Sequence, residues 1–211
     1  VLPKSSDNLS LEKFVKKNNK ICLVVNPSIN KGLEPLMLLA RKLELERPDI
    51  SLWFIDGRNQ FHKDLNYLGL KKNEIPKNIT IFPACNDIYK LYKNVKIVLL
   101  LSIWHESGSR LFIESYTQGI PVICFDTGGN IEFIKQNKND IFEYPETYED
   151  RNNKIRIKNW DNQKIYSRIC FLLDDQRYYE KYSKKLLSTN TYADKNNELK
   201  NSLKKLIDTL K

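Results

Sequence analysis

Short apolar runs alternate with segments of helical spacing along residues 21–125. The runs are apolar at consecutive positions, which is typical of strands buried on both faces of a parallel sheet. Segments of helical spacing between them predict helices that cover both sides of that sheet. The sequence therefore predicts an α/β protein with a doubly wound parallel sheet. The predicted strands are ICLVV (21–25), SLWFI (51–55), NITIF (78–82), KIVLLL (96–101) and PVICF (121–125).

The segments between these strands differ in how clearly their spacing predicts a helix. The polar stretch after Asp56-Gly57 has only weak periodicity, whereas residues 33–46 have clear helical spacing after the turn NPSINKG. Residues 86–94 predict a short helix with Asn86 or Asp87 as its N-cap, because such side chains accept hydrogen bonds from the first turn. A further helix follows IWHESGS, and we expect TGGN to lead into a short helix from about Ile131.

Beyond Glu146 the pattern changes to the polar linker TYEDRNNKIRIKNWDNQ and three amphipathic helices. The last helix carries a leucine stripe that must be buried against another surface. We therefore divide the chain into a linker-like segment (1–20), an α/β domain (21–150) and a basic linker with C-terminal helices (151–211). The three helices are predicted at residues 163–175, 177–188 and 197–211. The stripe consists of Leu199, Leu203, Leu206 and Leu210.

The composition is that of a single globular domain, since 211 residues with 41% hydrophobic content are enough for a full core. No apolar run approaches the roughly 20 residues of a membrane span, and the start VLPKSSDN lacks the apolar stretch of a signal peptide. We therefore expect a cytoplasmic protein. The missing initiator methionine suggests an excised piece or a processed product.

The four cysteines are far apart in the chain, so we expect buried, reduced thiols rather than disulfides. No Cys or His spacing indicates a metal site. These residues are Cys22, Cys85, Cys124 and Cys170.

The net charge of +9 is concentrated at the C-terminal end. Residues 1–150 carry 20 Lys and Arg against 19 Asp and Glu, whereas residues 151–211 carry 15 against 7. No nucleic-acid recognition motif accompanies this basic part, so we do not expect nucleic-acid binding. Peripheral contact with an anionic membrane surface stays open.

Ligands of doubly wound sheets bind at the carboxyl ends of the strands, which here are followed by NPSINKG, FPACND, IWHESGS and DTGGN. Gly108, Ser109 and Arg110 stand where a helix begins, so their backbone N–H groups are expected to attract a phosphate. Glu106 and Glu114 flank this turn about 6–9 Å apart. Carboxylates accept hydrogen bonds from vicinal hydroxyls, and this separation suits a sugar and a ribose joined by a diphosphate.

Several motifs in order carry a resemblance to a known family. Glu106 and Glu114 are separated by seven residues and followed by GIPV (119–122) and GGNIE (128–132). This arrangement resembles the donor-binding half of glycosyltransferase family 4, retaining enzymes of the GT-B fold, whose halves are Rossmann-like. NPSINKG is similar to the first glycine- and lysine-bearing loop of that family, and the likeness covers roughly residues 1–190.

The resemblance implies a role for each matching position. Glu106, the catalytic candidate, would contact the hydroxyls of the donor sugar, and Glu114 those of the ribose. Lys31 would neutralise the diphosphate, and the backbone of Gly108 and Ser109 would surround it. Gly128 and Gly129 form first a tight turn and second a place where a ligand can approach closely.

This sequence departs from the family pattern at two positions. Asn26 stands where the family usually has an arginine, and Leu101 stands where it usually has a proline. The lost arginine removes a fixed charge from the phosphate site, and Arg110 is our candidate to compensate. His105 is read as incidental, because a single loop histidine carries little signal.

The implied activity is transfer of a sugar, with retention, from a UDP- or GDP-linked donor to a glycan or lipid-linked acceptor, as in polysaccharide biosynthesis. No further cofactor is implied. The acceptor site would belong to a missing N-terminal half, on which the C-terminal helices would pack if not on this domain, and the isolated chain would be nearly inactive. Two alternatives stay open: half of a nucleotide-sugar 2-epimerase, and a non-catalytic nucleotide-sugar-binding or membrane-docking module.

Overall fold

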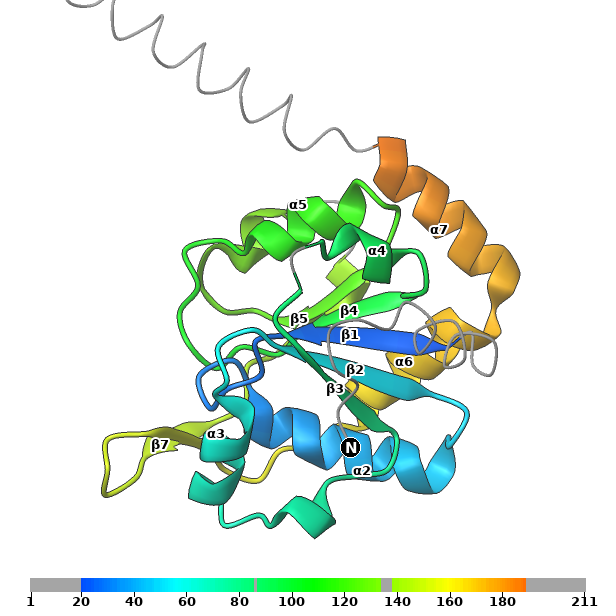
Figure 1. Cartoon of the computed structure of the whole chain (residues 1–211). Coiled ribbons are helices and arrows are strands. Elements are labelled where there is room, and N and C mark those ends of the chain that lie inside the picture. The colour runs from blue at the N-terminus through cyan, green and yellow to red at the C-terminus, as the bar shows by residue number, and fades with distance from the viewer. Residues whose placement is uncertain (1–19, 86, 134–137, 189–211) are drawn as a thin grey trace, which may run out of the picture.

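The computed structural model describes residues 20–85, 87–133 and 138–188, and it has a six-stranded parallel sheet at its centre (Figure 1). The strand order is β3-β2-β1-β4-β5-β6, so the chain builds outward from β1 to β3 and then returns to place β4 beside β1. The strands are β1 (Ile21–Val25), β2 (Ser51–Asp56), β3 (Ile79–Pro83), β4 (Ile97–Leu100), β5 (Val122–Phe125) and β6 (Ile141–Phe142).

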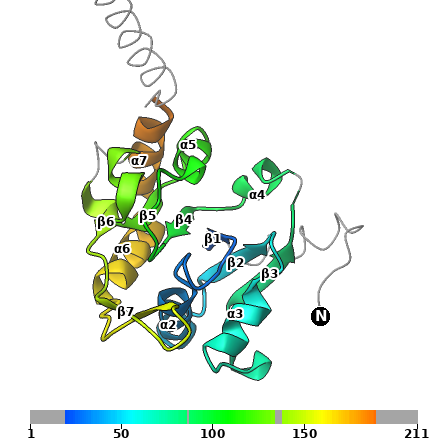
Figure 2. The ribbon, with the colours of Figure 1, turned by 90° about the vertical axis from the view of Figure 1, so that its left-hand side faces the viewer.

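Helices cover both faces of this sheet (Figure 2). In that view α2 and α3 lie below the strands, and α4 and α5 lie above them. Trp53 and Phe54 are neighbours on β2 that point to opposite faces, and both are fully buried, so both faces are covered. The helices are α2 (Leu33–Glu46), α3 (Phe61–Tyr67), α4 (Tyr89–Tyr92), α5 (Arg110–Tyr116), α6 (Gln163–Asp174) and α7 (Gln176–Ser188).

The predicted fold class is confirmed: the protein is an α/β, Rossmann-like doubly wound sheet. Each of the five predicted strands is present with its bounds shifted by two residues or fewer. The sequence did not predict β6, which has two residues, or α3, which has seven.

The helix predicted at residues 86–94 is shorter than expected. It spans only Tyr89–Tyr92, and its N-cap is Ile88 without a side-chain hydrogen bond. The prediction of Asp87 as N-cap is therefore wrong: its carboxylate lies 3.8 Å from the ammonium group of Lys90. Asn86 lies outside the described residues. The helix expected from about Ile131 is a 3₁₀ turn that begins earlier, at Gly128–Phe133.

The stretch predicted to be a polar linker contains an antiparallel hairpin, β7 (Thr147–Glu149) and β8 (Ile155–Ile157). The hairpin is attached to the body by Arg156, whose Nε and Nη2 donate to the Glu34 carboxylate of α2 at 3.0 and 2.8 Å. At its turn, Asp150 accepts a hydrogen bond from the Tyr67 hydroxyl of α3. The hairpin is thus held by long-range polar contacts and by Ile157 of β8, which is buried in the hydrophobic core.

Helices α6 and α7 pack on the α/β body. Asp140, fully buried before β6, accepts from Arg168 Nε of α6 at 2.6 Å and from the Tyr182 hydroxyl of α7. The Tyr179 hydroxyl of α7 donates to the carbonyl oxygen of Lys96 at 2.9 Å. These contacts fix the two helices against the sheet. Residues 1–19 and the helix predicted at 197–211 lie outside the described residues.

The four cysteines are free thiols, but they are not all buried as predicted. Cys22 and Cys124 are buried in β1 and β5, and burial raises the pKa of both thiols. Cys170 is half-buried, and Cys85 is exposed because the chain has already left β3 at that point. Within the described residues, the structure contains no helix of the length and apolarity that crossing a membrane requires.

Candidate functional site

The loops that follow β1, β4 and β5 gather at the carboxyl edge of the sheet, the side from which Figure 2 is viewed. The strand order reverses between β1 and β4, because successive connections run in opposite directions from there. Side chains in the loops after these two strands can therefore approach one another, which makes this point the usual ligand site of doubly wound sheets.

Lys31 and Glu106 meet at this point. The Lys31 ammonium group forms an ion pair with the Glu106 carboxylate across 75 residues of sequence. The same carboxylate accepts a hydrogen bond of 2.8 Å from the Ser102 hydroxyl. The side chains of Lys31 and Glu106 are 28% and 12% exposed, so the pair lies at the surface of the edge and a ligand can reach it.

Glycine at position 32 allows the two loops to interlock. Gly32 has φ +79°, and a Cβ there would overlap the backbone carbonyl oxygen of Leu101. Asn30 accepts a hydrogen bond on its carbonyl oxygen from Ile103 N at 3.0 Å, and the same carbonyl oxygen lies 3.1 Å from the hydroxyl oxygen of Ser102. The loop that carries Lys31 is thus held directly against the loop that carries Glu106.

Asn26 lies at the end of β1 but outside this ion pair. Its φ is +54°, and its backbone N–H donates to Ile55 O at 2.7 Å. Its Oδ1 is buried and has no hydrogen-bond partner among the described residues. That oxygen lies close to Gly57, where a Cβ would be 2.9 Å away. The neutral amide thus points toward the end of β2 and does not supply the charge of an arginine.

The turn before α5 has the predicted position, and its backbone is partly occupied. Gly108 has φ +123°, and Ser109 is the N-cap, its hydroxyl accepting from Leu111 N at 3.4 Å. The Ser109 N–H donates to Asn130 Oδ1 at 3.3 Å, so one of the two amides predicted to surround a phosphate has a protein partner. Arg110 is exposed and makes no ion pair within the described part of the chain.

Gly128 and Gly129 pack against the loop that carries Glu106. Gly128 has φ +56°, and a Cβ there would overlap the carbonyl oxygen of Glu106. Gly129 N donates to that same oxygen at 2.6 Å, and a Cβ on Gly129 would lie 2.7 Å from Ser107 O. Both glycines are therefore needed for contact between two loops, whatever they do for a ligand.

Glu114 has different surroundings from Glu106. It lies on the second turn of α5, half-buried, and accepts a hydrogen bond of 3.4 Å from the Tyr92 hydroxyl of α4. Burial, and next the charge of Glu114, raises the pKa of the Tyr92 phenol. No hydrogen bond joins Glu114 to Glu106 or Lys31 among the described residues, so any link between the two carboxylates would pass through a ligand.

Four residues that sequence reasoning did not assign to the site support it. Ser102 binds Glu106, and the other three contact the backbone of residues 102–109 from the loops after β5 and β6. Their polar side chains were the only available signal. Ser102 lies four residues from Glu106, but the other three contact backbone groups that lie 21 or more residues away. These residues are Ser102, Thr127, Asn130 and Tyr144. His105 is exposed.

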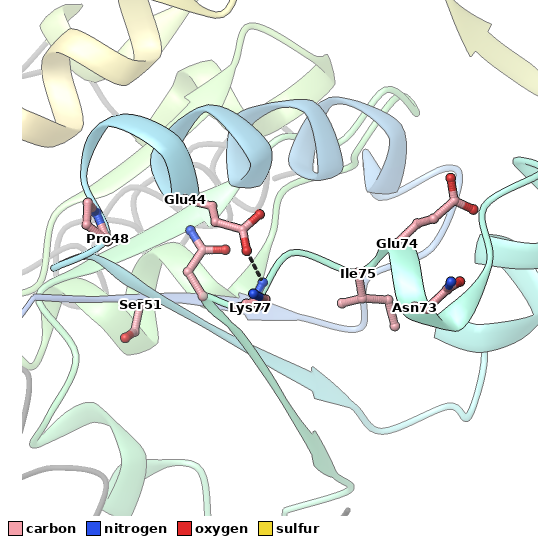
Figure 3. Close-up of a pocket in the computed structure, with 8 residues that line it drawn as sticks. Glu44, Pro48, Ser51, Asn73, Glu74, Ile75 and Lys77 are labelled. Atoms are coloured by element: carbon pink, nitrogen blue, oxygen red, sulfur yellow. Dashed lines mark hydrogen bonds between the residues drawn. The ribbon is translucent and has the colours of Figure 1, made fainter.

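A separate hollow of about 750 Å³ lies at the opposite edge of the sheet, between the end of α2, the start of β2 and residues 73–78 (Figure 3). Two of its carboxylates already bind local backbone: Glu44 accepts from Lys77 N and Glu74 from Lys71 N, both at 2.7 Å. This hollow shares no residue with the loops described above, and we assign no function to it.

Comparison with known proteins places the chain in a family. Residues 7–185 match the model of the family Glycosyl transferases group 1. The chain is 31% identical over 136 residues to spore coat protein SA of Bacillus subtilis, an alignment that covers 58% of this chain and 36% of that protein. It is 29% identical over 135 residues to an uncharacterized glycosyltransferase of Methanocaldococcus jannaschii, with 62% and 33% covered.

The fold is similar to that of a solved structure of about twice the length. Anabaena HepE in complex with UDP-glucose superposes with a TM-score of 0.65 at 16% identity, over 97% of this chain and 54% of that chain. The chain spans about a third of the curated relatives that it matches. On the match over residues 7–185, the chain belongs to the group 1 glycosyltransferases.

Proposed function

We propose that the chain is the donor-binding half of a retaining, family 4 glycosyltransferase of hexosyltransferase type. The whole protein would transfer a sugar from a UDP- or GDP-linked donor to a glycan or lipid-linked acceptor. The observation that carries this proposal is the Lys31–Glu106 pair at the reversal point of strand order, in a chain of this family. The family match does not favour an epimerase or a non-catalytic module.

The pair offers the two kinds of contact that a nucleotide sugar requires. Lys31 would move toward the diphosphate and stabilise the negative charge that develops on the leaving group, an effect that is large in a pocket shielded from water. Glu106 would then accept hydrogen bonds from sugar hydroxyls, while Ser102 keeps its carboxylate oriented. Glu114 would accept the ribose hydroxyls from its place on α5.

Because the chain spans only part of its relatives, the acceptor site is proposed to lie in the remainder of the whole protein. A neighbour in fold, HepE, was crystallised with UDP and with UDP-glucose, which supports a nucleotide sugar as ligand here. We propose that the whole protein acts in the cytoplasm and contacts the membrane surface peripherally through its basic C-terminal part.

The test is calorimetric titration of the chain with UDP and with GDP. We expect saturable binding of one nucleotide, and an increase of about tenfold or more in Kd for Lys31→Met and for Glu114→Ala, since each removes a charge-assisted contact. Lys181→Met, an exposed substitution on α7, is the control and should bind as the wild type does. If neither nucleotide binds, or if both variants bind like the control, the proposal is wrong.

A further inference from the structure

We propose that Thr127 and Asn130 are positioning residues for the candidate site. Their side chains form one buried hydrogen-bonded unit that holds both ends of residues 102–109, the segment that carries Glu106. The expected effect on donor binding rests on the proposed function. The contacts themselves are independent of that function.

The unit runs across the base of the segment from one end to the other. The Thr127 hydroxyl donates to the carbonyl oxygen of Ser102 at 3.3 Å and accepts from Asn130 Nδ2 at 3.4 Å. Asn130 Oδ1 in turn accepts from the backbone N–H of Ser109 at 3.3 Å. Thr127 is 5% exposed and Asn130 is fully buried, so water is not available to replace a lost partner.

The Thr127 hydroxyl makes two of the hydrogen bonds in this unit. Without it, the Asn130 Nδ2 donor would be buried and unpaired, and the carbonyl oxygen of Ser102 would lose its hydrogen bond from Thr127. The distances are long for single hydrogen bonds, so their main effect is on the cost of leaving buried groups unsatisfied. The segment is therefore fixed at Ser102 and at Ser109 together.

Two further contacts hold the same segment between these ends. Gly129 N donates to Glu106 O at 2.6 Å, and the Tyr144 hydroxyl donates to Ile103 O at 2.9 Å. Glu106 thus has its backbone held by the loops after β5 and β6, while its carboxylate faces Lys31 and Ser102 from the loops after β1 and β4. A shift of this backbone would move the carboxylate away from both.

The experiment compares Thr127→Val, which keeps the volume and removes the hydroxyl, with Thr127→Ser, which keeps the hydroxyl. Amide hydrogen exchange is measured for residues 103–109 and, as an internal reference, for β4. We expect exchange at residues 103–109 to be about tenfold faster in Thr127→Val, with β4 unchanged and Thr127→Ser close to wild type. Asn130→Ala is a second variant, for which we expect the same pattern.

Binding of UDP and GDP to the same variants tests the consequence for the site. We expect Kd to rise about tenfold in Thr127→Val and to return to the wild-type value in Thr127→Ser. Unchanged exchange at residues 103–109, or equally faster exchange across β4, would overturn the holding role. Faster loop exchange with an unchanged Kd would overturn the positioning role. Absence of nucleotide binding in the wild type would overturn the proposed function, and the positioning role with it, while exchange would still decide whether the unit holds the segment.

Discussion

Gly32 and Gly69 have nearly the same backbone conformation and very different surroundings. Their φ angles are +79° and +74°, but a Cβ at Gly32 would overlap Leu101 O, whereas nothing lies within 4 Å of one at Gly69. We expect Gly69→Ala to lower the free energy of unfolding by about 1 kcal/mol, the cost of a left-handed alanine. Gly32→Ala should cost more than about 3 kcal/mol, because the backbones must also separate. Urea unfolding measures both.

The difference between the two variants reports on the packing of the loop that carries Lys31. Equal losses of unfolding free energy would show that only the backbone conformation matters and that the close approach to Leu101 is relieved at little cost. The larger loss in Gly32→Ala would instead confirm that Gly32 is required because two loops touch there.

Arg110 is our candidate to supply the positive charge that the first loop lacks, where Asn26 stands in place of an arginine. It is exposed on the first turn of α5, without an ion pair in the described part of the chain. If it contacts the diphosphate, Arg110→Ala should raise the Kd of the bound nucleotide about tenfold, since a charge-assisted hydrogen bond is lost. Arg177→Ala, on the exposed face of α7, is the matched control. A Kd unchanged by Arg110→Ala would show that Arg110 does not replace the arginine charge that is lost at Asn26.

At the residue scale the sequence could identify candidates but not their partners. The resemblance pointed to Lys31 and Glu106 as separate ligand contacts, and the structure brings them together across 75 residues. Asn130 stood in the GGNIE motif without a role, because its partner Ser109 lies 21 residues away. Local spacing carries no information on such pairs, so they could not be predicted.

The end of α6 is joined to α2 and β1 by a cluster of charges. Arg47 donates from both terminal nitrogens to Asp174, at 2.8 and 2.9 Å, and Lys20 donates to Asp174 at 2.7 Å. Hydrogen bonds from Arg47, and next from Lys20, hold the pKa of the Asp174 carboxyl below its usual range. A carboxyl with a lowered folded-state pKa stabilises the fold above its unfolded pKa, near 3.9, and loses that effect as the pH falls further.

We therefore expect Asp174→Asn to be less stable than wild type by at most about 1 kcal/mol at pH 7, since half of the side chain is exposed and solvent screens the pair. The difference should shrink as the pH falls below about 4, where wild-type Asp174 also becomes neutral. Urea unfolding at several pH values between 7 and 2 measures it. Asp87→Asn, which removes a 3.8 Å exposed ion pair, is the control. A difference that is constant with pH would contradict this explanation.

At the element scale, apolar strands could be predicted, and elements that depend on distant polar contacts could not. Helix α3 begins where Asp56, at the end of β2, accepts from Gln60 N and Phe61 N at 2.9 and 3.2 Å, a cap several residues before the helix. Strand β8 is held by the Arg156–Glu34 pair across 122 residues. Neither contact is visible in local spacing, and the alternation of Ile155 and Ile157 spans only three residues, which is too short to predict a strand.

At the scale of the whole molecule, the loops at the carboxyl edge of the sheet expose two large apolar side chains. Trp104 and Ile131, in the loops after β4 and β5, are 52% and 47% exposed beside the candidate site. Large exposed apolar side chains near a site are typical of surfaces that another part of a protein covers. The chain spans about half of the HepE structure, which agrees with a site completed by further residues.

An open edge of this kind should bind a nucleotide without catalysing transfer. In the proposed function Lys31 would stabilise a leaving diphosphate, but transfer also needs an acceptor hydroxyl held in line and a group that takes its proton. The acceptor site is proposed to lie in the remainder of the whole protein. We therefore expect the 211 residues to release UDP from UDP-glucose, or GDP from GDP-mannose, no faster than buffer does. Coupled detection of free nucleotide measures this, with Lys31→Met as the blank.

The outcome separates the possible assignments of the whole molecule. Binding without release agrees with a donor-binding half whose acceptor site lies elsewhere. Release that needs an added glycan acceptor and is lost in Lys31→Met would show that these residues already contain a complete transferase site, contrary to our expectation. Release without any acceptor would instead favour chemistry of the 2-epimerase type, because there the nucleotide leaves before any new glycosidic bond forms. The same protein and the same two donors thus test whether the site at the carboxyl edge, where Trp104 and Ile131 are exposed, is incomplete.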